Sequence, residues 1–361
     1  MNPSLAVMRR ERVISRDRVV LGVKSLIAYS AVISGAAALA RRGHRDGLRI
    51  LMYHGVVRRR HGPVSFGNLF VSERAFARHM RHLRQAFCPI SLDAALTAWI
   101  TGRSLPPRAV AVTFDDGYEN VLSVALPILQ RYRIPATVFV SAAAVGSRRW
   151  YWFDALRVFV WERAGLGASI GSDHDDVLGE RPITHPERAF LRGLKEIEQR
   201  PRPEREAVTR RLANLGENPR WTEQHPEFTL ANWTQWRQAV AGGLIDIGSH
   251  GMNHGDLLAM SAQERLADLQ ASKRVIEHEL SRPCRILAYP HGRWDASVVE
   301  ATREAGYSCA LTTDDGLNDA QRDPLTWQRT MIGDKGDFYL FCARVCGLWD
   351  RARAARPARA A

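Results

Sequence analysis

The sequence predicts an α/β fold whose parallel strands form a closed or nearly closed sheet. Short apolar or β-branched runs alternate with segments of helical periodicity along most of the chain. Strands that alternate with helices pair in parallel, because each crossover returns the chain to the same end of the sheet. The 361 residues, 45% of them hydrophobic, are enough for one large domain of this class or two smaller ones.

The first half of the chain contains three predicted strands and three predicted helices. Ser72 and Ser91 precede two of the helices, and a serine oxygen there can accept a hydrogen bond from a free N–H of the first turn. Gly55 is expected to turn the chain after the first strand. The strands are predicted over 48–54, 110–114 and 136–140, and the helices over 72–85, 91–100 and 121–132.

The alternation stops between residues 147 and 232, where aromatic residues are followed by a charged, proline-rich run. We interpret this segment as a largely helical insertion that forms a lid or a wall for substrate. For any single tryptophan, a role in attaching the insertion to the core is the alternative. Residues 173–176 (Asp-His-Asp-Asp) could mimic a metal cluster, but their Gly/Ser-rich surroundings favour a solvated loop. The aromatic residues are Trp150, Trp152, Phe153, Phe159 and Trp161.

The alternation resumes after residue 232. Ser261 and Glu264 have the spacing of a capping box at the start of a long helix. We therefore predict a domain over 48–350 that contains the insertion 147–232. The strands are predicted over 244–248, 285–289, 308–312 and 326–332, and the helices over 261–280, 296–305 and 337–348.

The net charge of +13 is concentrated at the two ends of the chain. Residues 1–47 have a net charge of +6 and the Arg/Ala tail 351–361 has +4, which leaves +3 for residues 48–350. We find no helix-turn-helix, finger or RNA-binding motif, so no nucleic-acid partner is expected. Basic termini fit an anionic lipid surface or a solvated tail as well as they fit nucleic acid.

The basic N-terminus contains an apolar stretch over 19–40. It has the length needed to span a bilayer, about 20 residues, but Lys24 and three serines weaken it. No cleavage site is evident, so we expect a retained segment rather than a signal peptide. An interfacial or spanning anchor is our interpretation, and a helix packed on the domain is the alternative. The protein is thus expected to be membrane-associated through this helix, or else cytoplasmic.

The five cysteines are odd in number, and no two of them form a Cys-x-x-Cys pair. This pattern favours buried free thiols over a disulfide framework or a structural zinc site. The cysteines are Cys88, Cys284, Cys309, Cys342 and Cys346.

Two adjacent carboxylates, Asp115 and Asp116, follow the predicted strand 110–114. Adjacent aspartates repel each other, so such a pair is expected where one carboxylate binds a cation and the other stays free to take a proton. The carboxyl ends of parallel strands are also where α/β folds place their sites. The alternative is an Asp-Asp-Gly turn without chemical function.

His250 and His254 stand four residues apart after another predicted strand. One helical turn or a tight loop would point both imidazoles the same way. Two histidines and one carboxylate leave positions open on a divalent metal, which is the arrangement of a hydrolytic site rather than a structural one. The glutamate of His-Glu-x-x-His is missing, which argues against a thermolysin-type protease.

These residues resemble the successive motifs of a known family, the polysaccharide deacetylases of carbohydrate esterase family four, which share the NodB-homology fold. The resemblance extends over residues 48–332, apart from the insertion. It implies the distorted (β/α) barrel of that family, with a helical insertion and an N-terminal apolar helix. The motifs, in order, are 113–117 (Thr-Phe-Asp-Asp-Gly), 249–254 (Ser-His-x-x-x-His) and 289–292 (Tyr-Pro-x-Gly).

The resemblance implies a role for each motif residue. Asp116, His250 and His254 would bind a divalent metal, zinc in first place, with cobalt, nickel, iron or manganese as alternatives. Asp115 would be the general base that activates water. The backbone N–H of His291 would help the metal to hold the developing oxyanion. General chemistry supports the same roles for the two aspartates, because a metal lowers the pKa of water towards about 7 and a second carboxylate can then take its proton.

Two departures from the family pattern concern the remaining roles. The family usually has an arginine before the proline of the third motif to orient the base, but Ala288 stands there, and Arg329 is expected to supply this charge. The late Leu-x-His that supplies the general acid is also absent. The poly-N-acetylglucosamine deacetylase branch, closest in motif layout, carries a Tyr-His on an early strand for this purpose. Tyr53 and His54 match it, so His54 is the predicted acid and His291 the alternative donor.

We therefore expect a metal-dependent hydrolase that removes acetyl groups from N-acetylated sugars of a polysaccharide, oligosaccharide or lipid-linked glycan. The expected partners are an N-acetylhexosamine-containing glycan and a membrane surface. Two alternatives stay open: a hydrolase of another non-peptide C–N bond on the same scaffold, and a membrane-tethered, inactive glycan-binding protein.

Overall fold

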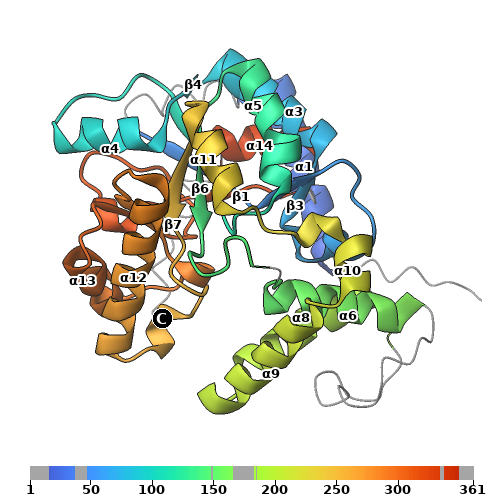
Figure 1. Ribbon diagram of the computed structural model, residues 1–361. Coiled ribbons are helices and arrows are strands. Elements are labelled where there is room, and N and C mark those ends of the chain that lie inside the picture. The colour runs from blue at the N-terminus through green and yellow to red at the C-terminus, as the bar shows by residue number, and fades with distance from the viewer. Residues whose placement is uncertain are drawn as a thin grey trace, which may run out of the picture.

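The computed structural model describes residues 16–36, 47–147, 149–165, 183, 185–333 and 337–348. An eight-stranded sheet of parallel pairs forms the centre of the molecule, in the order β10-β1-β5-β6-β7-β8-β9, with β4 beside β5 (Figure 1). The strands are β1 (Arg49–Tyr53), β4 (Cys88–Pro89), β5 (Ala109–Phe114), β6 (Ala136–Val140), β7 (Ile245–Ser249), β8 (Ile286–Ala288), β9 (Cys309–Leu311) and β10 (Thr330–Met331).

The sheet nearly closes on itself. Leu311 of β9 forms a parallel bridge with Trp327, a residue of the segment that leads into β10. Two backbone hydrogen bonds hold this bridge: Trp327 donates to Ala310 at 3.0 Å, and Thr312 donates to Trp327 at 2.8 Å. Since β10 in turn pairs with β1, the two ends of the sheet are joined. The prediction of a distorted (β/α) barrel is confirmed.

Helices follow most of the strands, as predicted, and the expected serines begin them. Ser72, Ser91 and Ser261 each accept a hydrogen bond from the first turn of their helix, and Glu264 completes the capping box. The helices around the barrel are α3 (Glu73–Ala86), α4 (Leu92–Ile100), the π-helical turn η2 (Val121–Ala125), α5 (Leu126–Tyr132), α11 (Trp233–Ala241), α12 (Ala262–Leu280), α13 (Ala296–Glu304) and α14 (Phe338–Val345).

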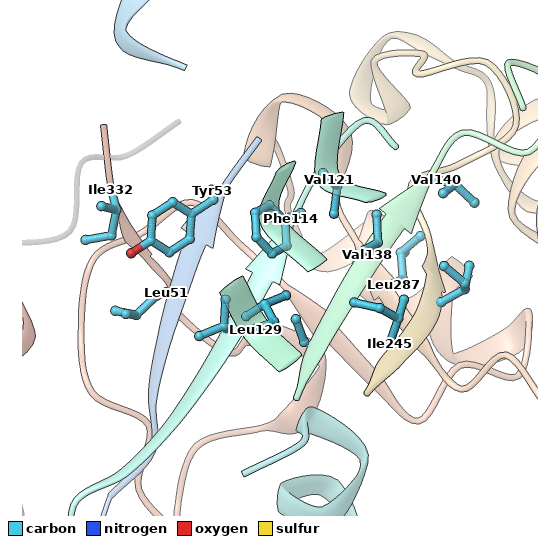
Figure 2. Close-up of a cluster of buried hydrophobic side chains, with 14 of the residues drawn as sticks. Leu51, Tyr53, Phe114, Val121, Leu129, Val138, Val140, Ile245, Leu287 and Ile332 are labelled. Carbon is cyan, nitrogen blue, oxygen red and sulfur yellow. The ribbon is translucent and has the colours of Figure 1, made fainter. Parts of the chain in front are cut away.

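Both faces of the central strands are buried. Leu51, Phe114 and Val138 pack on one face against Val121 and Leu129, which come from the helical segment after β5 (Figure 2). The alternate residues of the same strands belong to a second cluster on the other face. Strands covered on both faces carry apolar residues at most positions, which is why they can be recognised in the sequence as nearly continuous apolar runs.

The insertion is helical, as predicted, and has a core of its own. In Figure 1 its helices lie together at one end of the barrel. Their apolar side chains pack with Val64, Phe66 and Phe70 from the segment after β1. Residues 173–176 lie outside the described residues, and the domain limits stay a prediction. The elements are α6 (Trp152–Gly165), α8 (Pro186–Glu198), α9 (Arg202–Leu215), α10 (Pro219–Gln224) and η4 (Pro226–Phe228).

The expected turn at Gly55 is wrong. Gly55 begins a strand, β2 (Gly55–Val57), which pairs in parallel with β3 (Phe70–Ser72). A Cβ atom on Gly55 would lie 2.5 Å from the ring of Phe70, so glycine permits close packing here rather than a turn.

Two other elements differ from the prediction. Helix α11 follows the insertion directly and begins with an Asn232–Gln235 capping box that the prediction missed. The last predicted strand is shorter than expected, because Pro324–Thr326 forms the 3₁₀ turn η7.

The N-terminal apolar segment forms helix α1 (Arg16–Ile33), which packs against α14 (Figure 1). In the described part of the chain, no helix has both the length and the apolarity needed to cross a membrane. No disulfide joins any of the five cysteines, all of which the structure describes, and all except Cys88 are buried.

Candidate active site

Most of the residues selected from the sequence lie just beyond the carboxyl ends of strands. His54 follows β1, Asp115 and Asp116 follow β5, and His250 follows β7. His291 lies just after β8, and Arg329 immediately precedes β10. The barrel thus brings together residues that are up to 275 positions apart in the chain.

Asp116, His250 and His254 form a cluster whose potential ligand atoms all lie within 4.8 Å of one another. The Oδ1 atom of Asp116 is 3.3 Å from Nε2 of His254 and 3.7 Å from Nε2 of His250. Oδ1 is buried and has no hydrogen-bond partner. A buried carboxylate oxygen without a hydrogen bond is costly unless a cation satisfies it. The three side chains therefore fit a divalent metal.

The orientation of His250 supports the same interpretation. Its Nδ1 lies 2.8 Å from the carbonyl oxygen of Ala288 and must donate to it. The Nε2 lone pair then faces Asp116 and is free to bind a metal. Burial lowers the pKa of His250 to about 4, so the imidazole is neutral near pH 7, as a metal ligand must be.

The loops that present the ligands have unusual backbone conformations. Asp116 and His254 have φ angles of 73° and 55°, in the left-handed region that L-residues rarely adopt. The hydroxyl of Tyr151 donates to the carbonyl oxygen of Asp116 at 3.0 Å. Such strain persists where surrounding contacts impose it, and Tyr151 supplies one such contact.

Aromatic rings from the start of the insertion enclose His254. The rings of Tyr151 and Phe153 stack on each other, and their centroids lie 5.2 and 5.4 Å from that of His254. Sequence reasoning missed Tyr151. The aromatic cluster at residues 150–161 was the available signal, but nothing in it distinguished Tyr151 from residues that only fill a core.

Arg329 forms a bidentate pair with Asp115. Nη1 and Nη2 donate to the two carboxylate oxygens at 2.6 and 2.9 Å, and Nε donates to the carbonyl of Thr312 at 2.9 Å. Both side chains are buried. Burial alone would raise the pKa of Asp115, but the charge of Arg329 outweighs it and the pKa is lowered. Asp115 is thus held ionised in one orientation.

His54 follows Tyr53, whose carbonyl oxygen accepts a hydrogen bond from the N–H of Asp115 at 3.0 Å. Burial lowers the pKa of His54, while the charges of Asp116 and Asp115 oppose that change. His291 has a φ of 58°, and its ring packs edge-on against His254 at 4.6 Å between centroids. Both predicted proton donors therefore border the three candidate ligands.

Comparison with known proteins identifies the family. The family profile described as polysaccharide deacetylase matches residues 102–173 and 213–310, which include Asp115, Asp116, His250, His254 and His291. The chain belongs to the polysaccharide deacetylase family. It is accordingly a hydrolase of the carbohydrate N-deacetylase class.

Curated relatives of this deacetylase are distant. The candidate polysaccharide deacetylase YxkH of Bacillus subtilis is 23% identical over 281 residues, which are 76% of this chain and 67% of YxkH. The poly-β-1,6-N-acetyl-D-glucosamine N-deacetylase of Escherichia coli K12 is 20% identical over 273 residues, 73% of this chain. The match spans 34% of the length of that E. coli protein.

Solved structures share the fold of the deacetylase. IcaB from Ammonifex degensii superposes with a TM-score of 0.54 at 20% identity, over 84% of this chain and 98% of IcaB. The Streptococcus pyogenes deacetylase PplD, solved in complex with acetate, gives a TM-score of 0.54 at 17% identity, over 80% of this chain and 93% of PplD.

A groove leads from the candidate metal ligands of the deacetylase to the insertion. It has a volume of about 340 Å³ and runs from His254 and His291 to Trp152 of α6 and to α9. Arg202 and Arg205 line its far wall. The insertion therefore forms one side of the surface next to the candidate ligands, as a substrate wall would.

Proposed function

We propose that the protein hydrolyses the acetamide of N-acetylated hexosamine units in a polysaccharide, an oligosaccharide or a lipid-linked glycan, with the help of a divalent metal. The observation that carries the proposal is the pairing of two carboxylates with different partners. Asp116 faces two imidazoles that can share a cation with it, whereas Asp115 is held by Arg329 and does not belong to that cluster.

Asp116, His250 and His254 would hold the metal, and zinc suits this set of nitrogen and oxygen donors. A divalent cation supplies Lewis acidity, which acidifies water and polarises the amide carbonyl. The chain itself contributes a dry, shaped site, since the side chains of all three ligands are less than 10% exposed.

Asp115 is the proposed general base. Its bidentate pair with Arg329 keeps the carboxylate ionised and fixes its direction, so that it can take a proton from the water that attacks the acetamide carbon. Ala288, at the end of β8, brings no charge, and the orienting charge comes instead from Arg329, which immediately precedes β10.

His54 is the proposed general acid. As the C–N bond breaks, acetate is released and the sugar nitrogen needs a proton to leave as an amine. His54 lies beside the carboxylates in the barrel, since the backbone N–H of Asp115 donates to the carbonyl oxygen of Tyr53. The backbone N–H of His291 is proposed to stabilise the developing oxyanion.

Release of acetate from N-acetylglucosamine oligomers by the zinc- or cobalt-loaded protein tests this proposal. We expect Asp115→Asn and His54→Ala to lower kcat by a factor of about 10² to 10⁴, while metal content measured by mass spectrometry stays at the wild-type level. His278→Ala is the matched control, because His278 is 86% exposed and remote from these residues.

Each other outcome has a defined meaning. If the metal-loaded wild type releases no acetate from any N-acetylhexosamine oligomer, the proposed function is wrong. If the wild type is active and His54→Ala is equally active, the acid is wrongly assigned and His291→Ala is the next variant. Activity on small non-sugar amides alone would instead indicate a different C–N hydrolase.

A further inference from the structure

The outer surface of helix α1 is apolar. Leu26 and Ile33 are each 65% exposed, and Val23 is 53% exposed. Nine large apolar side chains are exposed in the described part of the chain, and five of them belong to this one helix. They are Val23, Leu26, Ile27, Tyr29 and Ile33.

Four of these side chains share one face of the helix. At 100° per residue, Val23, Leu26, Ile27 and Ile33 project to the same side. Ser30 lies among them, and Lys24, the one charged residue between Val23 and Ile33, projects to another side. A helix on the surface of a soluble domain normally turns charged and polar residues outward. Helix α1 has the reverse arrangement, which indicates that its outer face has a partner.

The inner side of α1 fixes the helix on the domain. Ala28 and Ala31 are buried, and Ala28 packs with Leu340 and Ala343 of α14. The ring of Tyr29 meets that of Tyr339 edge-on, at 4.9 Å between centroids. Because the small residues face the domain, the large apolar residues are left to face outward. Packing on the domain therefore does not account for them.

The charge around α1 indicates the kind of partner. Residues 1–47 contain nine basic and three acidic residues, a net charge of +6, whereas residues 48–350 carry only +3. An apolar helical face flanked by cations complements a bilayer that contains anionic lipids. The apolar side chains enter the boundary between head groups and acyl chains, and the cations attract the phosphates.

We propose that the outer face of α1 docks the deacetylase onto the surface of a membrane that contains anionic lipids. The helix lies in the plane of the interface, with α14 and the barrel on its other side. This inference does not depend on the proposed function, since it concerns a surface and not the catalytic residues.

Co-sedimentation of the full chain with vesicles tests the inference. We expect binding to vesicles of phosphatidylcholine and phosphatidylglycerol, weaker binding to phosphatidylcholine alone, and a further loss in high salt. The double variant Leu26→Gln/Ile33→Gln should lower the partition coefficient on the order of tenfold. Ile100→Gln/Leu191→Gln is the matched control, because these two side chains are 53% and 46% exposed on other helices.

The inference is overturned if the wild type does not bind anionic vesicles, or if the α1 variant binds them as well as the control variant does. It is also overturned if sedimentation equilibrium shows a dimer that the α1 variant abolishes and vesicle binding is absent, because a second copy then covers the face. Circular dichroism and acetate release from soluble oligomers should be unchanged in both variants, which separates docking from folding and catalysis.

Discussion

The guanidinium of Arg329 is buried together with the carboxylate that it binds, and this makes the pair sensitive to the loss of either partner. Arg329 donates two hydrogen bonds to Asp115, and both side chains are buried. Taking away one charge leaves the other buried and uncompensated, which is costly in a medium of low polarity.

Arg329→Met should therefore lower the free energy of unfolding by about 3–5 kcal/mol and abolish acetate release. Urea denaturation measures the first effect. Arg303→Met is the control: Arg303 pairs with Glu300 and Asp323 on the surface and is 51% exposed, so its loss should cost less than about 1 kcal/mol. Equal losses in the two variants would contradict a special role for Arg329.

Tyr151→Phe removes only the hydroxyl that donates to Asp116, while the ring can stay against His254. We expect metal affinity to fall roughly 10- to 100-fold, as when other outer partners of metal ligands are lost. Competition with a chelating dye measures it. Tyr307→Phe is the control, because its hydroxyl donates to a carbonyl oxygen of α12 and not to a candidate metal ligand. Its metal affinity should equal that of the wild type. An unchanged affinity in Tyr151→Phe would show that the aromatic packing suffices.

At the scale of elements, the contact between α3 and α14 includes a buried histidine. His79 stacks on Phe341 with 3.8 Å between centroids, and its Nδ1 lies 3.3 Å from the hydroxyl of Tyr53. Burial, with Arg78 and His82 nearby, lowers the pKa of His79 to about 3. Between pH about 3 and 6.5 the histidine is therefore neutral in the folded protein but charged in an unfolded chain.

Because the folded pKa is the lower one, this group stabilises the fold above pH 6.5 and the contribution is lost as the pH falls towards 3. The loss over this window is on the order of 5 kcal/mol, at about 1.4 kcal/mol for each pKa unit between 6.5 and about 3. His79→Gln should flatten the decline in unfolding free energy over that window, relative to the wild type and to the exposed control His278→Gln. Parallel curves for all three proteins would refute the argument.

Some of the strands and helices could be predicted from the sequence and others could not. The central strands were predictable because burial on both faces makes most of their positions apolar, and Ser72, Ser91 and Ser261 marked helix starts by their capping chemistry. The strand at Gly55 was not predictable, because its glycine serves a contact with Phe70 on the neighbouring strand β3 and so resembles a turn residue in the sequence. The position of Arg329 was anticipated from a missing charge, but the contact of Tyr151 with Asp116 depends on how the insertion folds back.

At the scale of the whole molecule, a bound metal would connect loops after β5 and β7. Zinc at 100 times its dissociation constant should stabilise the chelator-treated protein by about 2.7 kcal/mol, which corresponds to a rise in Tm of roughly 4 °C for a chain of this size. Differential scanning calorimetry measures the shift. Asp116→Asn and His254→Ala should lose it, whereas Asp115→Asn should keep it. A full shift in Asp116→Asn would exclude Asp116 as a ligand.

The way in which the barrel closes has a consequence for synthesis. Arg329 is 214 positions beyond Asp115, and it reaches the carboxylate through the segment that joins β9 to β10 and β1. A ribosome releases Asp115, Asp116, His250 and His254 long before it releases Arg329. A nascent chain, or one cleaved before Arg329, would thus contain all the candidate metal ligands, but its general base Asp115 would lack the arginine that orients it. Full hydrolytic competence would arise only when β10 is in place, so catalysis depends on synthesis of the chain through Arg329.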